Sequence, residues 1–468
     1  MERKQAMERN PLDPLLIHPE ERGLVTDLYQ LTMWAAYQRH RPGVRGVFEL
    51  WFRDLPPNRG FLIFAGLAPA LGFLQDLRFT SEQVKALREL PAVSGLDEGF
   101  FRSLEEFRFS CDVWAMPEGT PVFAGEPVLR VEGPIEHAQL VETYLLAAVS
   151  FSTLVASKAA RVRLAAGDTR VVDFGSRRAH GPLAACWAAR SAYLAGLDAT
   201  SNVWAALRLG IPESGTMAHS FVLSFADELT AFRAFAETFP ERTFLLVDTF
   251  DTLAAVKRAA ADPQLRFLGV RLDSGDLVAL SRAVRGILDQ HGRREVKIVV
   301  SGDLDEYRIG QLRQAGAPID AFGVGTRMVT SEDAPALQAV YKLVAVQDPH
   351  GPMRAVAKSS AGKETLPGAK QVYRESNASG FFLRDLVLPA EAKPPQGFFQ
   401  PLLLPVMRGG RVVSPLPELA EIRRYVHEQL ARLPEGVKNL ENPKAFPVVF
   451  SLGEKPQATN PQAGGPRR

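Results

Sequence analysis

Between about residues 142 and 346, short apolar runs alternate regularly with longer amphipathic segments, and this alternation constrains the fold more than any other feature. The apolar runs are rich in β-branched residues and have the length of buried strands, whereas the segments between them have helical spacing. Strands that alternate with helices predict a parallel α/β sheet, either a barrel or a doubly wound sheet. The predicted strands are residues 170–174, 243–247, 267–271, 296–300, 319–324 and 339–346.

Five of the predicted strands run directly into polar clusters that often contain glycine. In a parallel α/β fold the carboxyl ends of all strands point to one face, so we expect these clusters to converge on one pocket. The clusters are Gly175-Ser176-Arg177-Arg178, Asp248-Thr249, Asp273-Ser274-Gly275-Asp276, Ser301-Gly302-Asp303 and Gly325-Thr326-Arg327.

The last two clusters favour a phosphate. Ser301-Gly302-Asp303 and Gly323-Val324-Gly325-Thr326 are small, glycine-rich turns before helices, and their backbone N–H groups suit an anion. Phosphate sites also recur at the late strands of (β/α)8 barrels. The alternative is that these glycines serve only the tight turns between strand and helix.

Four aspartates, Asp248, Asp273, Asp276 and Asp303, form the acidic side of the same face. Carboxylates beside a phosphate site suggest Mg²⁺ or hydrogen bonds to sugar hydroxyls. The alternative, which is compatible with the first, is that Asp273 or Ser274 caps the helix that follows.

Arginine and histidine side chains complete the candidates. Arg177 and Arg178 suit a bidentate grip on a carboxylate or phosphate, although an arginine pair can equally begin a solvated or salt-bridged helix. His219 lies in a turn of small residues, where it can be a general base, a nucleophile toward phosphorus or a hydrogen-bonded structural histidine. His180, just after the arginine pair, is the second histidine candidate.

The flanking regions lack the regular alternation. Residues 21–141 mix helix and strand signals and predict an N-terminal α/β domain, which we expect residues 347–452 to complete by packing on it. Residues 142–346 are then the catalytic α/β barrel domain. The polar residues 1–20 predict a flexible arm, and the Pro- and Gln-containing residues 453–468 predict a disordered tail.

Composition narrows the class of protein. The chain has 55 basic and 53 acidic residues, a formal charge of +2, so we expect neither nucleic acid nor a membrane as a partner. Two cysteines, Cys111 and Cys186, cannot form a disulfide framework, and no secretory signal is apparent, which predicts a reducing cytoplasm. P-loop, Rossmann, zincin and α/β-hydrolase motifs are absent from the sequence, and those enzyme classes are disfavoured.

Several blocks of the sequence resemble the nicotinate phosphoribosyltransferases of NAD salvage, a type II phosphoribosyltransferase family. The blocks occur in family order and span most of the chain. They are TDLYQLTM (26–33), VDFGSRRAHG (172–181), TSNVWAA (200–206), IPESGTMAHSF (211–221), LLVDTFDT (245–252), VRLDSGDL (270–277), VSGDLDE (300–306), FGVGTRMVTS (322–331) and LPGAKQVYR (366–374).

The resemblance implies an irregular (β/α) barrel domain plus an α/β sandwich-like domain built from the N- and C-terminal parts. It implies a cytoplasmic enzyme, formally a ligase, that converts nicotinate and phosphoribosyl pyrophosphate to nicotinate mononucleotide and pyrophosphate by glycosyl transfer. ATP is the implied co-substrate and Mg²⁺ the implied cofactor. Mg²⁺ would be held mainly by the pyrophosphate, with Asp273 or Asp276 as candidate ligands. A homodimer is also implied.

Roles follow from the resemblance residue by residue. His219 is similar to the histidine that ATP transiently phosphorylates, and Asp273 is expected to be catalytic. Phe174 is similar to one aromatic residue that stacks on the pyridine ring, and Tyr29 to the other, supplied by the second subunit. The other expected substrate-binding residues are Arg177, Arg178, Thr200, Ser201, Arg271, Ser301, Gly302, Asp303, Gly323, Gly325 and Thr326.

Those residues divide by the part of the substrate they would face. The arginine pair would hold the substrate carboxylate or nearby phosphate oxygens. The ribose side would be lined by Arg271, Asp273, Gly302 and Asp303, and the 5′-phosphate by Gly323, Gly325 and Thr326. The chain departs from the family pattern at Ala199, where glycine is usual; a positive φ there would cost about 1 kcal/mol.

Two positions bear on the choice between acid and amide. Nicotinamide-using relatives have an aspartate at the position of Ser201 and a glycine at that of Arg178. A carboxylate would repel nicotinate, whereas Ser201 is neutral and Arg178 adds positive charge, so both differences favour the acid.

Three alternatives stay open. One is the nicotinamide-specific relative. Another is a phosphate-binding barrel lyase or aldolase, which would need a Schiff-base lysine at a strand end, whereas Lys297 stands at a strand start. The third is a catalytically silent ligand-binding paralogue, against which His219, Asp273 and Asp303 argue.

Overall fold

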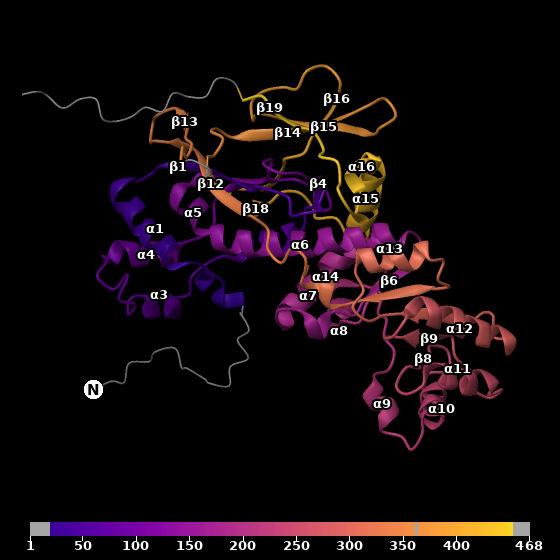
Figure 1. The fold of residues 1–468 in the computed structure, drawn as a ribbon. Helices are drawn as coiled ribbons and strands as arrows, with labels where there is room; N and C mark the ends of the chain where they lie inside the picture. The colour runs from indigo at the N-terminus through magenta and orange to yellow at the C-terminus, as the bar shows by residue number, and fades with distance from the viewer. Residues whose placement is uncertain (1–18, 361–363, 453–468) are drawn as a thin grey trace, which may run out of the picture.

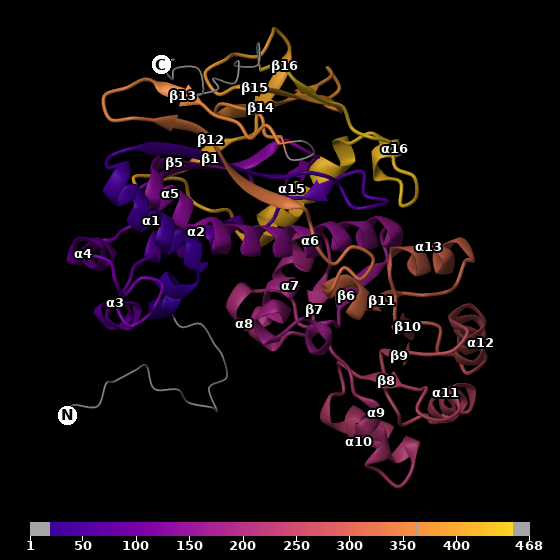
Figure 2. The same cartoon turned by 60° about the vertical axis from the view of Figure 1, so that its left-hand side comes forward.

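The computed structural model describes residues 19–360 and 364–452. The chain forms two α/β parts, one around a parallel sheet and one from both ends of the chain, with the long helix α6 (Glu142–Ala166) between them (Figures 1 and 2). This arrangement confirms the predicted fold class. The expected tail lies outside the described residues, as does the expected arm, except for the first two residues of the short helix η1 (Pro19–Leu24).

Six parallel strands form the sheet of the predicted barrel, in the order β7-β6-β11-β10-β9-β8. The sheet is curled, but its edge strands β7 and β8 do not pair, so it is an open, irregular half-barrel. Five of the six predicted strands belong to it. The strands are β6 (Arg170–Asp173), β7 (Ala199–Thr200), β8 (Phe244–Leu246), β9 (Gly269–Leu272), β10 (Lys297–Val300) and β11 (Ala321–Val324).

Helices connect these strands, as parallel pairing requires, and share a large apolar core with them. Several begin at an Asn or Asp whose side chain accepts a backbone N–H of the first turn. The cap of α12 is Asp276, not Asp273 or Ser274 as the sequence suggested. The helices are α7 (Pro182–Leu194), α8 (Val203–Leu209), α9 (His219–Leu223), α10 (Glu228–Thr238), α11 (Thr252–Ala261), α12 (Leu277–Gln290), α13 (Glu306–Gln314) and α14 (Thr326–Val329).

The last strand of the predicted alternation belongs to a different sheet. Residues 339–346 do form a strand, β12 (Ala339–Gln347), but it pairs antiparallel with β1 (Arg45–Phe52). Parallel neighbours need a crossover helix, and only the four-residue α14 lies between β11 and β12. The apolar run at residues 339–346 therefore predicted the strand correctly, but the prediction that this strand belongs to the parallel sheet was wrong.

The second part joins the two ends of the chain, as predicted. Its seven-stranded sheet has the order β13-β12-β1-β5-β3-β17-β18, so the C-terminal β17 pairs with the N-terminal β3. A four-stranded sheet, β16-β14-β15-β19, and a short pair, β2-β4, complete this part. These strands are β2 (Leu62–Ile63), β3 (Asp112–Ala115), β4 (Pro121–Val122), β5 (Pro127–Pro134), β13 (Met353–Ala355), β14 (Lys370–Ser376), β15 (Phe382–Pro389), β16 (Phe398–Pro401), β17 (Leu404–Arg408), β18 (Arg411–Val412) and β19 (Val448–Phe450).

Helices from both ends of the chain surround these sheets. The C-terminal helix α15 contacts α7, so the C-terminal region packs on the half-barrel as well as on the N-terminal sheet. The helices are α1 (Leu28–His40), α2 (Leu67–Asp76), α3 (Ser81–Leu87), α4 (Glu98–Glu106), α5 (Ile135–Leu140), α15 (Leu419–Arg432) and α16 (Glu435–Lys438).

A buried ion pair fastens β14 to β1. The Lys370 ammonium lies 2.8 Å from the Glu49 carboxylate, and the backbone N–H of Lys370 donates to the same group at 2.7 Å. Burial raises the pKa of Glu49, although Lys370 works in the opposite direction. This pair lies in the sheet part of the molecule, away from the half-barrel (Figure 1).

Helix α6 is long and apolar enough, by length and composition, to cross a membrane. Within the protein, however, 78% of its most apolar window is buried, as in the core helix of a soluble protein. It contacts α2 and β2 on one side and α7 and α13 on the other. Its apolar character is therefore accounted for by packing between the two parts.

Candidate functional site

The carboxyl ends of the parallel strands bring the predicted clusters to one edge of the half-barrel. Backbone hydrogen bonds hold neighbouring ends together: Phe174 donates to the carbonyl of Val324 at 2.7 Å, and Ser301 donates to that of Leu272 at 2.8 Å. The turns that follow β6, β11, β10 and β9 therefore lie side by side.

The guanidinium of Arg271, in β9, links several of these turns. It donates to Oγ of Ser301 at 2.8 Å, to Oγ1 of Thr216 at 3.2 Å and to Oδ1 of Asp273 at 2.7 Å. Its Cζ also lies 5.3 Å from the centre of the Phe174 ring, within the range of a cation–π contact. A single arginine thus joins the ends of β6, β9 and β10.

Asp273 is held in its ionised form. Burial opposes the charge, but hydrogen bonds from Ser301 and Arg271, together with the positive charge of Arg271, outweigh it and keep the pKa below its ordinary value. Both hydrogen bonds go to Oδ1. The side chain is 30% exposed, so a carboxylate with Oδ2 outside these bonds reaches the surface of the site.

Phe174 packs against Gly323. A Cβ at Gly323 would lie 2.5 Å from two carbons of the ring, so the ring needs glycine at this position. This contact is a reason for the glycine that the sequence did not indicate. Phe174 also lines a cavity of about 540 Å³ that combines apolar walls with charged residues at the amino ends of the strands; the apolar residues include Val172, Phe244 and Val299, and the charged ones Arg170, Lys297 and Asp320. The cavity is large enough for a pyridine ring.

The turn after β10 has the close approach expected of glycine. Gly302 has a φ of 95° and Asp303 one of 48°, both in the left-handed region. A Cβ at Gly302 would lie 2.0 Å from the carbonyl oxygen of Asp273. Gly325 directly precedes α14, which begins at Thr326. The tight-turn requirement is therefore real at Gly302, whereas a Cβ at Gly325 would make only ordinary contacts, the nearest at 3.6 Å. Neither observation is incompatible with an anion at the same backbone.

His219 begins α9 beside the same edge. Its Nδ1 forms a hydrogen bond with Oγ1 of Thr249 at 3.1 Å, and its Nε2 lies 3.9 Å from the carboxylate of Asp248. Asp248 in turn accepts the backbone N–H of Asp273 at 2.9 Å, while its Oδ1 is buried without a hydrogen-bond partner in the described structure. His219 thus has an acceptor near each ring nitrogen and is connected through Asp248 to Asp273.

Asp173 is a positioning residue that the sequence analysis missed. It is buried and accepts the backbone N–H of Gly175 and the hydroxyl of Thr200, both at 2.8 Å. Burial raises its pKa. The hydroxyl of Thr200, which is buried, is therefore engaged by Asp173, whereas the neighbouring Ser201 is exposed. An aspartate at a strand end, just before Phe174, was the available signal.

Ala199 does not strain this region. It lies in β7 and pairs with Val172, and it is not among the described residues with positive φ. The glycine that is usual in the family at this position is therefore not required here by backbone conformation.

Arg177 and Arg178 form the short helix η2 (Ser176–Arg178) at the end of β6. Both are exposed, and no ion pair to either is found within residues 19–360 and 364–452. The salt-bridged helix start is thus excluded within that range, whereas a solvated helix start stays open. Their position next to Phe174 leaves both guanidinium groups available to an anion.

Tyr29 lies apart from this group. It stands on α1, where its hydroxyl donates to Glu142 at 3.3 Å, and α1 is distant from β6 in both views of the molecule (Figures 1 and 2). Within one chain the structure does not bring Tyr29 to Phe174. Its assignment to a neighbouring subunit stays a prediction.

The close approach at Gly302 can be tested by unfolding. Gly302→Ala should lower the free energy of unfolding by about 2 kcal/mol or more, because the methyl meets a carbonyl oxygen and φ is positive. Gly310→Ala is the matched control: Gly310 lies in α13 with open space around a Cβ, and a gain of about 0.5–1 kcal/mol is expected there. Urea unfolding measures both, and equal stabilities would contradict the geometry.

Comparison with known proteins adds to this geometry. Models of the nicotinate phosphoribosyltransferase family match three segments of the chain: the N-terminal domain at residues 24–150, the family region at 169–377 and the C-terminal domain at 396–453. Together these segments cover most of the chain.

Similar proteins carry the same name. A nicotinate phosphoribosyltransferase of Mycobacterium tuberculosis is 46% identical over 92% of this chain and 91% of its own length. That of Bacillus subtilis is 39% identical over 92% of both chains. The crystal structure of human nicotinic acid phosphoribosyltransferase superposes with a TM-score of 0.78 at 32% identity, over 91% of this chain and 97% of the human one. The chain therefore belongs to the nicotinate phosphoribosyltransferase family.

Proposed function

We propose that this member of the family transfers the phosphoribosyl group of phosphoribosyl pyrophosphate to nicotinate, and that ATP hydrolysis is coupled to the transfer through phosphorylation of His219. The products are nicotinate mononucleotide and pyrophosphate. The observation that carries the proposal is the unbroken series of contacts from Phe174 through Arg271 and Asp273 to Asp248 and His219. An aromatic surface, an ionised carboxylate and a histidine are thereby adjacent.

The pyridine ring is proposed to stack on Phe174, at the cavity that Phe174 lines. Arg177 and Arg178 then face the nicotinate carboxylate or a neighbouring phosphate, because they follow Phe174 at the end of β6. An exposed arginine suits this role, because a guanidinium can bind a carboxylate through two parallel hydrogen bonds.

The phosphates and ribose are proposed to lie along the turns after β9, β10 and β11. Arg271, Ser301, Gly302 and Asp303 would face the ribose, and the 5′-phosphate would bind the turn from Gly323 to Thr326. Loss of pyrophosphate builds positive charge at C1 of the ribose, so the reaction needs no protein nucleophile at that carbon. Fixed orientation of the ring nitrogen toward C1 supplies much of the rate.

Mg²⁺ would neutralise the leaving pyrophosphate. No group of three or more His, Cys, Asp or Glu side chains suited to a metal ion occurs among the residues described here. We therefore assign the ion mainly to the pyrophosphate oxygens. Asp273 and Asp276 both stay candidate protein ligands, because each accepts its side-chain hydrogen bonds in the described structure at Oδ1 and leaves Oδ2 outside them.

ATP would act through His219. Its imidazole takes the γ-phosphoryl group from ATP, which leaves ADP, and water later takes the phosphoryl group as phosphate. When one ring nitrogen attacks phosphorus through its lone pair, the ring proton is on the other nitrogen, and an acceptor beside that nitrogen can hold it. Thr249 and Asp248 lie next to the two nitrogens, so the ring can keep its orientation in the modified state.

The competing lyase has less support. Its Schiff-base lysine should stand at the carboxyl end of a strand. Lys297 opens β10 and pairs with Asp320 at 2.9 Å, at the opposite end of the strand from Ser301.

We further propose a homodimer in which Tyr29 of a second copy reaches the ring beside Phe174. Two exposed apolar surfaces support it. One is on α1, formed by Leu28, Tyr29 and Met33, and the other is on α8, formed by Val203, Trp204 and Leu207. The α8 surface directly follows the exposed Ser201, so a copy that covers it would also cover the site.

The first test is formation of nicotinate mononucleotide from nicotinate and phosphoribosyl pyrophosphate, with and without ATP. We expect product in both cases and a stimulation by ATP of about tenfold or more. His219→Ala should remove the stimulation and leave weak transfer at saturating phosphoribosyl pyrophosphate. No product from wild type would contradict the proposed reaction, and ATP coupling retained in the variant would contradict the role of His219.

Substrate choice gives a second test. Arg178→Gly combined with Ser201→Asp should shift the preference toward nicotinamide by about tenfold or more in the ratio of kcat/KM values, because the pair of changes removes a cation and adds a carboxylate. Steady-state rates on both bases measure the shift. An undiminished preference for nicotinate would show that other groups select the acid.

The dimer is tested at Leu207, which is 81% exposed and can be changed without disturbing the core. Leu207→Asp should weaken association by about tenfold or more, measured by sedimentation equilibrium. Val413→Asp, at an exposed position that lies on neither surface, should leave association unchanged. A monomeric wild type, or a variant that associates normally, would contradict the proposed interface.

A further inference from the structure

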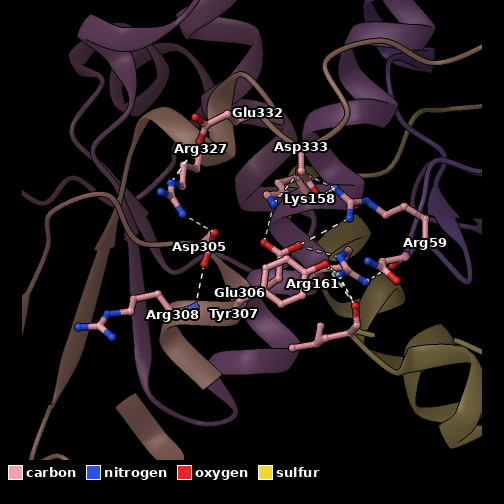
Figure 3. Close-up of polar contacts among 12 residues, drawn as sticks. Arg59, Lys158, Arg161, Asp305, Glu306, Tyr307, Arg308, Arg327, Glu332 and Asp333 are labelled. Atoms are coloured by element: carbon pink, nitrogen blue, oxygen red, sulfur yellow. Dashed lines mark hydrogen bonds and ion pairs between the residues drawn. The ribbon is translucent and has the colours of Figure 1, made fainter. Parts of the chain in front are cut away.

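A cluster of charged side chains lies buried behind the turns that follow β10 and β11 (Figure 3). Its centre is Glu306, the first residue of α13, whose side chain is fully buried. Lys158 and Arg161 of α6 approach its carboxylate to 2.6 and 2.8 Å, and Arg59, which precedes β2, approaches to 3.6 Å. None of these three cations is more than 3% exposed.

Lys158 forms ion pairs with one residue after each of the two turns. Its ammonium lies 2.6 Å from Glu306, three residues after the turn at 301–303, and 2.8 Å from Asp333, which lies beyond α14, seven residues after the turn at 323–326. Arg59 contacts the same two carboxylates. The segments that follow the two turns are therefore tied to helix α6, which carries Lys158.

A second ion pair, between Arg327 and Asp305, links the segments that follow the same two turns (Figure 3). Arg327, just after Thr326, donates to Asp305 at 2.8 Å and lies 3.1 Å from Glu332. Asp305 also caps α13 by accepting the backbone N–H of Arg308 at 2.8 Å. With contacts on both sides, the spacing between the two turns is fixed by ionic and hydrogen bonds, not by apolar packing alone.

Burial of these charges costs free energy, so the cluster is a poor source of stability. Three cations meet two carboxylates, and Nη1 of Arg59 has no hydrogen-bond partner in the described structure. Removing charges from water costs so much that apolar side chains of similar volume are often as stabilising. What the charges add is a defined distance and direction between groups on different segments.

We propose that Lys158 is a positioning residue, which never touches substrate but fixes the spacing of the two turns that bind the ribose and the 5′-phosphate of phosphoribosyl pyrophosphate. The inference rests on the proposed function, which puts the ribose at the turn after β10 and the 5′-phosphate at the turn after β11. Backbone groups that are already in place need not be ordered on binding. Loss of the tie should therefore weaken binding of phosphoribosyl pyrophosphate, with little effect on nicotinate.

The test compares Lys158→Met with wild type. The Kd for phosphoribosyl pyrophosphate, from calorimetry, and its KM should rise about tenfold, whereas kcat and the KM for nicotinate change less than about twofold. Asp333→Asn, at a side chain that is 35% exposed, loosens the same tie with less risk to folding and should shift the same two constants in the same direction. Lys158→Arg keeps the charge and should recover most of the affinity.

Lys370→Met is the matched control, because it also removes a buried lysine from a carboxylate, Glu49, but lies in the other part of the molecule. It should lower Tm and leave the Kd unchanged. If Lys158→Met and Asp333→Asn bind phosphoribosyl pyrophosphate as wild type does, Lys158 only stabilises the fold and the inference is wrong. If Lys158→Met does not fold, Asp333→Asn decides.

The proposed function can fail separately. Wild type that binds phosphoribosyl pyrophosphate but transfers nothing to nicotinate would contradict the proposed reaction alone, and the Kd values would still test Lys158. Wild type that does not bind phosphoribosyl pyrophosphate would contradict both.

Discussion

The site depends on the contacts that Arg271 makes with residues at the ends of neighbouring parallel strands. Because β9 pairs with both β8 and β10, a side chain at its carboxyl end lies within reach of the turns on either side. Arg271 uses that reach to bind Ser301 and Asp273 and to cover the Phe174 ring. Groups far apart in the sequence are thereby held in one charged and aromatic surface, which an antiparallel arrangement of the same strands would distribute over two edges.

Most strands of the half-barrel could be predicted from the sequence, whereas the neighbours of a given strand or side chain could not. The apolar runs predicted five of the six strands of the half-barrel but not the short β7, and the polar clusters after the predicted strands lie at one edge of the sheet. β12 was assigned to the wrong sheet, because an apolar run does not encode its neighbour. The buried bond from Thr200 to Asp173 was missed for the same reason, since it depends on β7 lying beside β6. The sequence also did not show which of Asp273, Ser274 and Asp276 caps α12, because the cap depends on the conformation of the loop between β9 and α12.

Many polar groups of the half-barrel face other protein groups and not the open site. Asp173 shapes the turn that carries the arginine pair, Asp248 connects His219 to Asp273, and Lys158 braces the turns after β10 and β11. Each binds groups from separate segments of the chain. Residues in this supporting layer are harder to identify from sequence than the exposed ones, because their chemistry is directed at the protein and resembles ordinary structural bonding.

The pairing of β3 with β17 also has a consequence for synthesis. β3 leaves the ribosome long before β17, which is almost the last strand to be made, and until then one edge of the N-terminal sheet has no neighbour. The half-barrel, whose strands are contiguous in sequence, can assemble during translation, whereas the sheet must wait for the chain to be nearly complete. Until β17 is made, the growing chain thus presents an unpaired strand edge, which is a template for pairing with another chain.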